Sequence, residues 1–386
     1  MNQLSYSTCL AIVCNIDAFL LSHRLPLALE ALQRGWRVVV MAADTGRRAE
    51  LEAYGITFVH IPFSRAGLNP LHEARCVYAL YKAYRYHKPD IVHHVGLKGI
   101  VAGSIAARLG GIKSVVNAVS GFGYAFTGEG RTLLCSITKM ALRLSCYSSC
   151  FRYIVQNPDD ALLIEHLGLS TAERITLIKG SGVCLRQFAY TSEPAEAHVR
   201  ILLPSRLLYD KGVMEFLQAA HLLRERLAGK ALFALAGQHD TGNPSVIPQS
   251  VLNEYLEPGY IEYIGFCKNM YEELKRSHIV VLPSYREGMP KALIEAAAVG
   301  RPLVATDAIG CRECVDDGVN GYLVPVKSVE LLAEAIYKLA VSSELRQGFG
   351  LASRRKAESE FGIDQVVAKT FAVYEESRNF SRLGRE

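Results

Sequence analysis

Two carboxylates stand eight positions apart in the stretch EGMPKALIE, which begins at Glu287 and ends at Glu295. The apolar run 278–284 before them predicts a buried strand, and the Ala-rich segment between them predicts a helix. Pro290 suits the first helical position, and Gly300 suits the position just past the helix end. Free N–H groups at such a helix start favour anions, whereas the carboxylates would favour neutral diols such as those of ribose or a hexose. The alternative is that Glu287 is a loop charge and Glu295 a solvated helix residue.

Two cations follow another predicted strand, in the stretch PSRLLYDKG. Arg206 comes directly after the strand and Lys211 stands at the start of the next helix. A planar guanidinium and a compact ammonium together suit a diphosphate. The alternative is a surface pair partly satisfied by Asp210. Because the carboxyl ends of parallel strands share one edge of a sheet, we expect this cluster beside the two glutamates.

Two histidines, His93 and His94, end a predicted strand in the first half, in the stretch DIVHHVGLKG. A histidine at that edge of a sheet could act as a general base or accept a hydroxyl proton. Side-chain alternation along a strand predicts that one of the two rings points inward. Spacing does not say which ring that is, and the inward one would be an ordinary core histidine.

Several other kinds of chemistry find little support. The chain has no Ser-His-Asp order with a nucleophile elbow and no H-E-x-x-H motif, so no metal site is indicated. Cys311 and Cys314 form a lone C-x-x-C, and the ten cysteines are scattered, mostly in apolar contexts, as expected of thiols in a reducing cytoplasm. The first predicted strand lacks the glycine fingerprint of dinucleotide-binding enzymes, which disfavours nicotinamide or flavin chemistry.

Short apolar runs alternate with helical patterns along all 386 residues. The runs are continuous and rich in β-branched residues, which is typical of parallel strands covered on both faces. The first series of predicted strands is 9–14, 37–42, 57–61, 90–94, 114–119 and 152–156. The second series is 200–205, 231–237, 260–265, 278–284 and 301–306. The pattern predicts an α/β protein with two doubly wound, Rossmann-like domains.

The polar stretch 186–198 separates the two series and reads as a linker. We therefore predict an N-terminal domain over 1–188 and a C-terminal domain over 189–365. Residues 366–386 are expected to form a helix that could cross back to the first domain. Because ligands of such sheets bind at the carboxyl ends of the strands, we expect the two domains to face each other across a cleft.

Charge is uneven along the chain, although the net charge is only +5. Residues 1–190 carry 20 Lys and Arg against 12 Asp and Glu, and the remainder carries 23 against 26. The basic helical segments 72–88 and 131–149 could rest on an anionic lipid surface, although ordinary core-covering helices are the alternative. The chain contains no dense basic run with interleaved aromatics, so binding to nucleic acid is disfavoured.

No signal peptide is recognised at the start, and no apolar run is long enough to span a bilayer.

The motifs together resemble the retaining nucleotide-sugar glycosyltransferases of the glycosyltransferase-B (GT-B) fold, specifically glycosyltransferase family four. EGMPKALIE matches the E-x7-E signature of that family, and the other motifs occur in the expected order around it. These are PSRLLYDKG, LAG at 235–237, GF at 265–266 and TDAIGCRE with DGVNGYLVP at 306–325. In the first half, NAVSGFGYAF and FLLSHRLPLALEALQRGW resemble the branch that acts on polyprenyl-diphosphate-linked glycans of bacterial surfaces.

The resemblance implies roles for matched positions. Glu287 would contact hydroxyls of the donor hexose and Glu295 those of the ribose. Arg206 and Lys211 would hold the diphosphate and stabilise its charge as it leaves, so that no metal or other cofactor is needed. His94 would contact the acceptor. The remaining donor-site positions are Gly288, Met289, Pro290, Lys291, Gly237 and Phe266.

The expected function is transfer of a hexose or N-acetylhexosamine from a UDP-sugar to a saccharide on a polyprenyl diphosphate, with retention of anomeric configuration. The protein would work in the cytoplasm, peripherally on the inner face of the cell membrane, in surface polysaccharide biosynthesis such as that of lipopolysaccharide or capsule. Three alternatives stay open: a nucleotide-sugar epimerase of the same fold, a starch- or sucrose-type transferase, and a non-catalytic nucleotide-sugar-binding protein.

Overall fold

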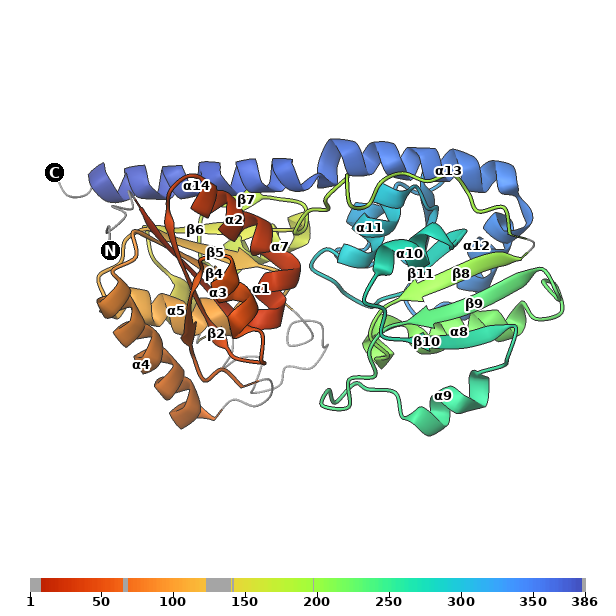
Figure 1. Cartoon of the computed structure of the whole chain (residues 1–386), viewed down its shortest axis with the longest axis horizontal. Coiled ribbons are helices and arrows are strands. Elements are labelled where there is room, and N and C mark those ends of the chain that lie inside the picture. The colour runs from red at the N-terminus through yellow and green to blue at the C-terminus, as the bar shows by residue number, and fades with distance from the viewer. Residues whose placement is uncertain (1–7, 65–68, 123–139, 141, 197, 384–386) are drawn as a thin grey trace. The chain divides into compact units, whose positions relative to one another are not determined.

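The structure, a computed structural model, describes residues 8–64, 69–122, 140, 142–196 and 198–383 (Figure 1). Contacts divide the chain into two compact units. The first contains Met1–Ser181 together with Asp364–Glu386, and the second contains Gly182–Ile363. The boundary falls earlier than the predicted position after 188. The reason is local: the Val183 amide donates to the Phe361 carbonyl, and the Ile363 amide donates to the Val183 carbonyl.

The first unit is built on a parallel sheet of seven strands in the order β3-β2-β1-β4-β5-β6-β7. The strands are β1 (Cys9–Ile16), β2 (Arg37–Ala43), β3 (Thr57–His60), β4 (Ile91–Val95), β5 (Val115–Val119), β6 (Phe151–Val155) and β7 (Ile175–Leu177). Its helices are α1 (Asp17–His23), α2 (Leu25–Gln33), α3 (Arg48–Ala53), α4 (Pro70–His87), α5 (Gly96–Leu109), α7 (Pro158–His166) and α14 (Ile363–Leu383), with a 3₁₀ turn at Ala172–Arg174.

Both faces of this sheet are covered, as the apolar runs predict. Along β1, Ala11 and Val13 join one hydrophobic cluster, whereas Leu10 and Ile12 join another on the opposite face. The C-terminal helix α14 contributes to the second cluster through Val366, Phe371, Val373 and Tyr374. The Ser114 hydroxyl also donates to Ser377 on α14 at 2.9 Å.

The second unit repeats the scheme with six parallel strands in the order β10-β9-β8-β11-β12-β13. The strands are β8 (Val199–Pro204), β9 (Ala231–Ala236), β10 (Ile261–Gly265), β11 (Ile279–Leu282), β12 (Leu303–Thr306) and β13 (Gly321–Val324). The helices are α8 (Val213–Leu222), α9 (Gln249–Tyr255), α10 (Met270–Lys275), α11 (Lys291–Val299), α12 (Val329–Val341) and α13 (Ser343–Lys356), with 3₁₀ turns at Tyr209–Lys211 and Arg312–Cys314 and a π-helical turn at Ala357–Phe361.

All the predicted strands are present, so the prediction of two doubly wound sheets is confirmed. The short strands β7 and β13 and the short helices α3 and α9 have no counterpart among the predicted elements. The predicted helix 131–149 and the glycines at 123–130 lie largely outside the described residues, although 142–146 are helical. Gly300 ends α11 with a φ of 85°, as predicted, whereas Pro290 is the residue before the helix and not its first residue.

Candidate active site

The predicted donor-site residues gather at the carboxyl edge of the second sheet. Strands β8 and β11 are neighbours at its centre, and the chain proceeds from them toward opposite edges. In doubly wound sheets the loops diverge at such a switch point and leave a crevice for ligands. Arg206 and Lys211 follow β8 and Glu287 follows β11, so both loops at the switch point carry ionic groups.

Two glycines let these loops approach each other closely. Gly212 has a φ of +70°, and a Cβ there would lie 2.0 Å from the Pro283 carbonyl oxygen on the β11 loop. Gly310 has a φ of +83°, and a Cβ there would lie 2.5 Å from the Glu287 carbonyl oxygen. Any larger residue would push the loops apart. The backbone thus brings the β8, β11 and β12 loops together around Glu287.

Lys211 and Glu287 form an ion pair across the switch point. Lys211 Nζ lies 2.5 Å from Glu287 Oε1, and the Ser284 hydroxyl donates to the same oxygen at 2.8 Å. The two charged side chains are only 14% and 16% exposed. Water therefore screens the pair weakly, and its geometry is held by the surrounding loops.

Arg206 pairs with a different carboxylate. Its Nη1 lies 3.2 Å from Asp240 Oδ2, and its side chain is half exposed. Asp210 forms no ion pair with Arg206 or Lys211 among the described residues. Its Oδ1 accepts a hydrogen bond from the Ser245 hydroxyl, and its carbonyl accepts one from the Tyr285 amide. The alternative of a surface pair satisfied by Asp210 is therefore wrong. Sequence reasoning missed Asp240 and Ser284, and nothing in the spacing pointed to Asp240.

Glu295 lies on α11 and is buried, with 8% of its surface exposed. The alternative of a solvated helix residue is therefore wrong. Lys291, one turn earlier, places its Nζ 3.2 Å from Glu295 Oε1. Burial raises the pKa of the Glu295 carboxyl, and the nearby Lys291 ammonium partly offsets this effect. A buried carboxylate beside a sheet edge can accept hydrogen bonds from a diol without competition from bulk water.

The other predicted donor-site positions share this edge. Gly237 is the first residue after β9, and Phe266, which is 68% exposed, is the first after β10. Gly288 lies in the β11 loop before α11. Met289 is buried and belongs to a hydrophobic cluster that includes residues of β11 and α11, so its backbone is the part left to line a site.

The two histidines of the first unit are both enclosed. His93 is 1% exposed and His94 is not exposed at all. His93 Nδ1 lies 3.0 Å from the Tyr374 hydroxyl of α14. His94 Nε2 lies 2.9 Å from the Tyr84 hydroxyl, and its Nδ1 lies 2.8 Å from Asn117 Oδ1. The expectation that a single ring points inward is wrong, because helices cover both faces of this sheet.

His94 is therefore a core residue in this structure, and its predicted contact with the acceptor finds no support there. Both of its ring nitrogens have protein partners. A Cβ at Gly103 of α5 would lie 2.5 Å from the ring, so a glycine is needed where the helix crosses it. Burial lowers the pKa of His94 to about 4, and the hydrogen bond to Asn117 opposes this shift.

A pH dependence of stability follows from the low pKa of His94. The unfolded chain binds a proton there near pH 6.5, whereas the folded protein resists protonation down to about pH 4. The stability from neutral His94 is therefore complete above pH 6.5 and is lost as the pH falls toward 4, by up to ~1.4 kcal/mol per pH unit. Urea unfolding at a series of pH values measures the free energy of unfolding. As the pH falls, this free energy should decline less steeply in His94→Gln than in wild type, whereas His166→Gln, a substitution of an exposed histidine, should keep the wild-type slope. An unchanged slope in His94→Gln would contradict this assignment.

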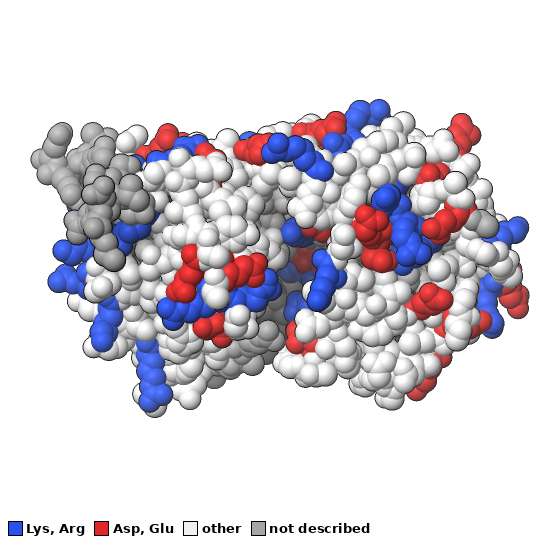
Figure 2. All heavy atoms as spheres, in the orientation of Figure 1, with Lys and Arg blue, Asp and Glu red and all other residues white. Residues whose placement is uncertain are grey.

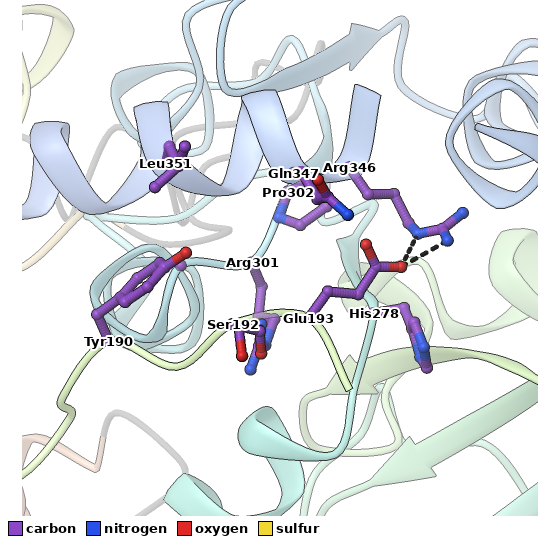
Figure 3. Close-up of a pocket in the computed structure, with 10 residues that line it drawn as sticks. Tyr190, Ser192, Glu193, His278, Arg301, Pro302, Arg346, Gln347 and Leu351 are labelled. Atoms are coloured by element: carbon purple, nitrogen blue, oxygen red, sulfur yellow. Dashed lines mark hydrogen bonds and ion pairs between the residues drawn. The ribbon is translucent and has the colours of Figure 1, made fainter. Parts of the chain in front are cut away.

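A pocket of about 300 Å³ lies elsewhere in the second unit, at the amino edge of its sheet (Figure 3). It is opposite the candidate site, because His278, Arg301 and Pro302 precede β11 and β12. Arg346 Nη2 lies 2.5 Å from Glu193 Oε1, and Arg301 donates to the carbonyls of Thr191 and Ser192. These contacts fasten the predicted linker to the second unit.

Comparison with protein families agrees with the geometry. Residues 198–341 match the family model described as "Glycosyl transferases group 1", and residues 11–154 match the one described as "Glycosyl transferase 4-like". The first match contains all six strands of the second sheet. The chain belongs to the glycosyltransferases.

Curated relatives are similar over most of this glycosyltransferase. It is 28% identical over 341 residues to the N,N'-diacetylbacillosaminyl-diphospho-undecaprenol alpha-1,3-N-acetylgalactosaminyltransferase of Campylobacter jejuni, which covers 84% of this chain and 87% of the relative. It is 24% identical over 337 residues to the UDP-Gal:alpha-D-GlcNAc-diphosphoundecaprenol alpha-1,3-galactosyltransferase of Escherichia coli, covering 80% and 84% of the two proteins.

A solved structure shares the fold. Anabaena HepE, crystallised in complex with UDP and glucose, superposes with a TM-score of 0.76 at 17% identity, over 96% of this chain and 100% of that chain. At that identity the likeness shows the GT-B fold, with its two doubly wound domains. Among the described residues, no helix is both long and apolar enough to cross a membrane.

Proposed function

We propose that this glycosyltransferase moves a hexose or N-acetylhexosamine from a UDP-sugar to a saccharide carried on a polyprenyl diphosphate, in the assembly of a bacterial surface polysaccharide. The observation that carries the proposal is the juxtaposition of Lys211, Arg206, Glu287 and Glu295 at one carboxyl edge. The names of the two curated relatives support the proposed class of acceptor, because both describe transfer to a saccharide on diphospho-undecaprenol. Both relatives are transferases, which disfavours an epimerase.

The reaction assigns a task to each group. The acceptor hydroxyl oxygen attacks the anomeric carbon on the face from which the diphosphate leaves, so the anomeric configuration is retained. The bond between that carbon and the diphosphate oxygen breaks, its electron pair stays with UDP, and the acceptor proton passes to a departing phosphate oxygen. Lys211 and Arg206 stabilise the negative charge that develops on UDP, a task that a metal ion would otherwise perform.

Glu287 accepts hydrogen bonds from the hydroxyls of the transferred sugar, and Glu295 from the ribose. Screening a panel of UDP-sugars for UDP release, with and without a synthetic polyprenyl-diphosphate saccharide, tests the proposed function. We expect one donor to give release that depends on the acceptor. Conversion of a donor to another UDP-sugar without acceptor would instead identify an epimerase, and binding without turnover would identify a non-catalytic protein.

The outer face of α4 supports a peripheral position on the cytoplasmic face of the membrane. Leu71, Arg75, Tyr78, Lys82 and Tyr86 fall on one side of the helix and are all exposed. Lys and Arg spheres project from the part of the surface in Figure 2 where Figure 1 places α4. A face of basic residues and tyrosines matches the interface of a bilayer with anionic lipids.

Vesicle flotation tests this surface. At low salt we expect the protein to float with vesicles that contain anionic lipid, and raising the salt concentration should release it. The triple variant Arg75→Glu, Lys82→Glu, Arg85→Glu should stay at the bottom of the gradient. A matched triple variant in the second unit, Lys230→Glu, Arg276→Glu, Arg355→Glu, should still float. If both variants float like wild type, α4 is not the surface that contacts lipid.

A further inference from the structure

Ser284 has a hydroxyl at the centre of the candidate site, on the loop that follows β11. The residue is completely buried. Its hydroxyl lies 2.8 Å from Glu287 Oε1 and 3.2 Å from the Asp210 carbonyl oxygen. Its own carbonyl accepts a hydrogen bond from the Thr306 hydroxyl at the end of β12. Ser284 therefore contacts both loops of the switch point and the neighbouring strand.

A serine hydroxyl has one proton to donate, and the two acceptors compete for it. The Asp210 carbonyl already accepts from the Tyr285 amide at 3.0 Å. The Glu287 carboxylate is charged and closer, and a hydrogen bond to a charged acceptor is the stronger kind. The proton therefore goes to Glu287 Oε1.

The two carboxylate oxygens of Glu287 therefore differ in their hydrogen-bond partners. Oε1 accepts from both Lys211 and Ser284. Oε2 has no partner within the described part of the chain, and it is not enclosed. One oxygen thus fixes the orientation of the carboxylate, while the other remains available to a hydroxyl of the donor sugar.

We propose that Ser284 is a positioning residue, which holds Glu287 in place when the donor diphosphate draws Lys211 away. This inference rests on the proposed function. In the structure, Lys211 is paired with Glu287. A bound diphosphate competes for the same ammonium, and Ser284 is then the remaining partner of Oε1. Ser284 acts on the transferred sugar through Glu287 and contacts neither UDP nor the sugar.

The proposal predicts a split between binding and turnover in Ser284→Ala. We expect kcat to fall by about 10- to 100-fold, the effect of losing one hydrogen bond to a charged group. The Kd for UDP, which lacks the sugar, should stay within about twofold of wild type. Ser277→Ala is the matched control: Ser277 is equally buried, precedes the same strand β11, and donates to the Glu273 carbonyl. Its kinetics should match those of wild type.

A double-mutant cycle separates positioning from general damage to the fold. If Ser284 works through Glu287, adding Ser284→Ala to Glu287→Gln should change kcat by less than about twofold. Equal kcat in Ser284→Ala and wild type would overturn the proposal. So would a multiplicative loss in the double variant, or a parallel loss of UDP affinity, since either result indicates a purely structural role. A wild-type protein that transfers no sugar would instead contradict the proposed function. In that case the affinity for the UDP-sugar tests the positioning role: Ser284→Ala should lower it while leaving the affinity for UDP unchanged, and an unchanged UDP-sugar affinity would refute the role.

Discussion

Lys211→Ala and Arg206→Ala are each expected to lower kcat for sugar transfer by about 100- to 1,000-fold, the usual effect of removing one group that stabilises developing charge. The reason is the diphosphate, which gains negative charge as its bond to the sugar breaks. The largely buried Lys211 ammonium acts where water screens charge weakly, so Lys211→Ala should be the more damaging variant. Initial rates of acceptor-dependent UDP release at saturating donor measure the effect.

Arg226 provides the matched control for these two variants. It pairs with Glu334 in the same unit, and it precedes the amino end of β9, away from the carboxyl edge. Arg226→Ala therefore removes a cation from an ion pair without touching the site. Near-normal rates in both Lys211→Ala and Arg206→Ala would show that the two cations do not stabilise the leaving group.

Glu287→Gln is expected to separate binding of UDP from transfer of the sugar. Transfer should fall by at least about 100-fold, because the amide is a weaker acceptor both for the sugar hydroxyls and for the Ser284 hydroxyl that positions the side chain. Affinity for UDP should be equal to wild type or higher, because the substitution frees Lys211 from a competing carboxylate. Calorimetric titration with UDP, alongside kinetics with the UDP-sugar, measures the two effects.

Two further variants test whether this separation of binding from transfer is specific to Glu287. Glu334→Gln, the other half of the control ion pair, should leave both quantities unchanged. Glu295→Gln should weaken UDP binding, since its proposed partner is the ribose and not the sugar. A parallel loss of UDP affinity and transfer in Glu287→Gln would mean that Glu287 holds the nucleotide.

The sequence predicted most of the fold because most strands are continuous apolar runs covered on both faces. Runs such as 279–282 lie in the core from end to end, and the glycine after α11 marked its end correctly. The short strands β7 and β13 are only partly buried, and neither belongs to a continuous apolar run that would have marked it as a strand. The edge that holds the site could be predicted as well, because parallel strands end on the same side of a sheet.

Side-chain partners could not be read from the sequence. Lys211 and Glu287 are 76 positions apart, and only folding shows that the loops of β8 and β11 meet there. Alternation suggested that one histidine of β4 would be open, but α14 returns from the end of the chain to cover the face that carries His93. Burial of Glu295 likewise depends on how α11 packs, which the local pattern of an Ala-rich helix leaves open.

The most direct test of the account is mass spectrometry of a defined polyprenyl-diphosphate saccharide after incubation with the preferred UDP-sugar. The account predicts that wild type adds one hexose or N-acetylhexosamine residue to the acceptor, and that the Arg206→Ala, Lys211→Ala double variant leaves the acceptor mass unchanged. An unmodified acceptor with every UDP-sugar in the wild-type reaction, or equal product from the double variant, would contradict it.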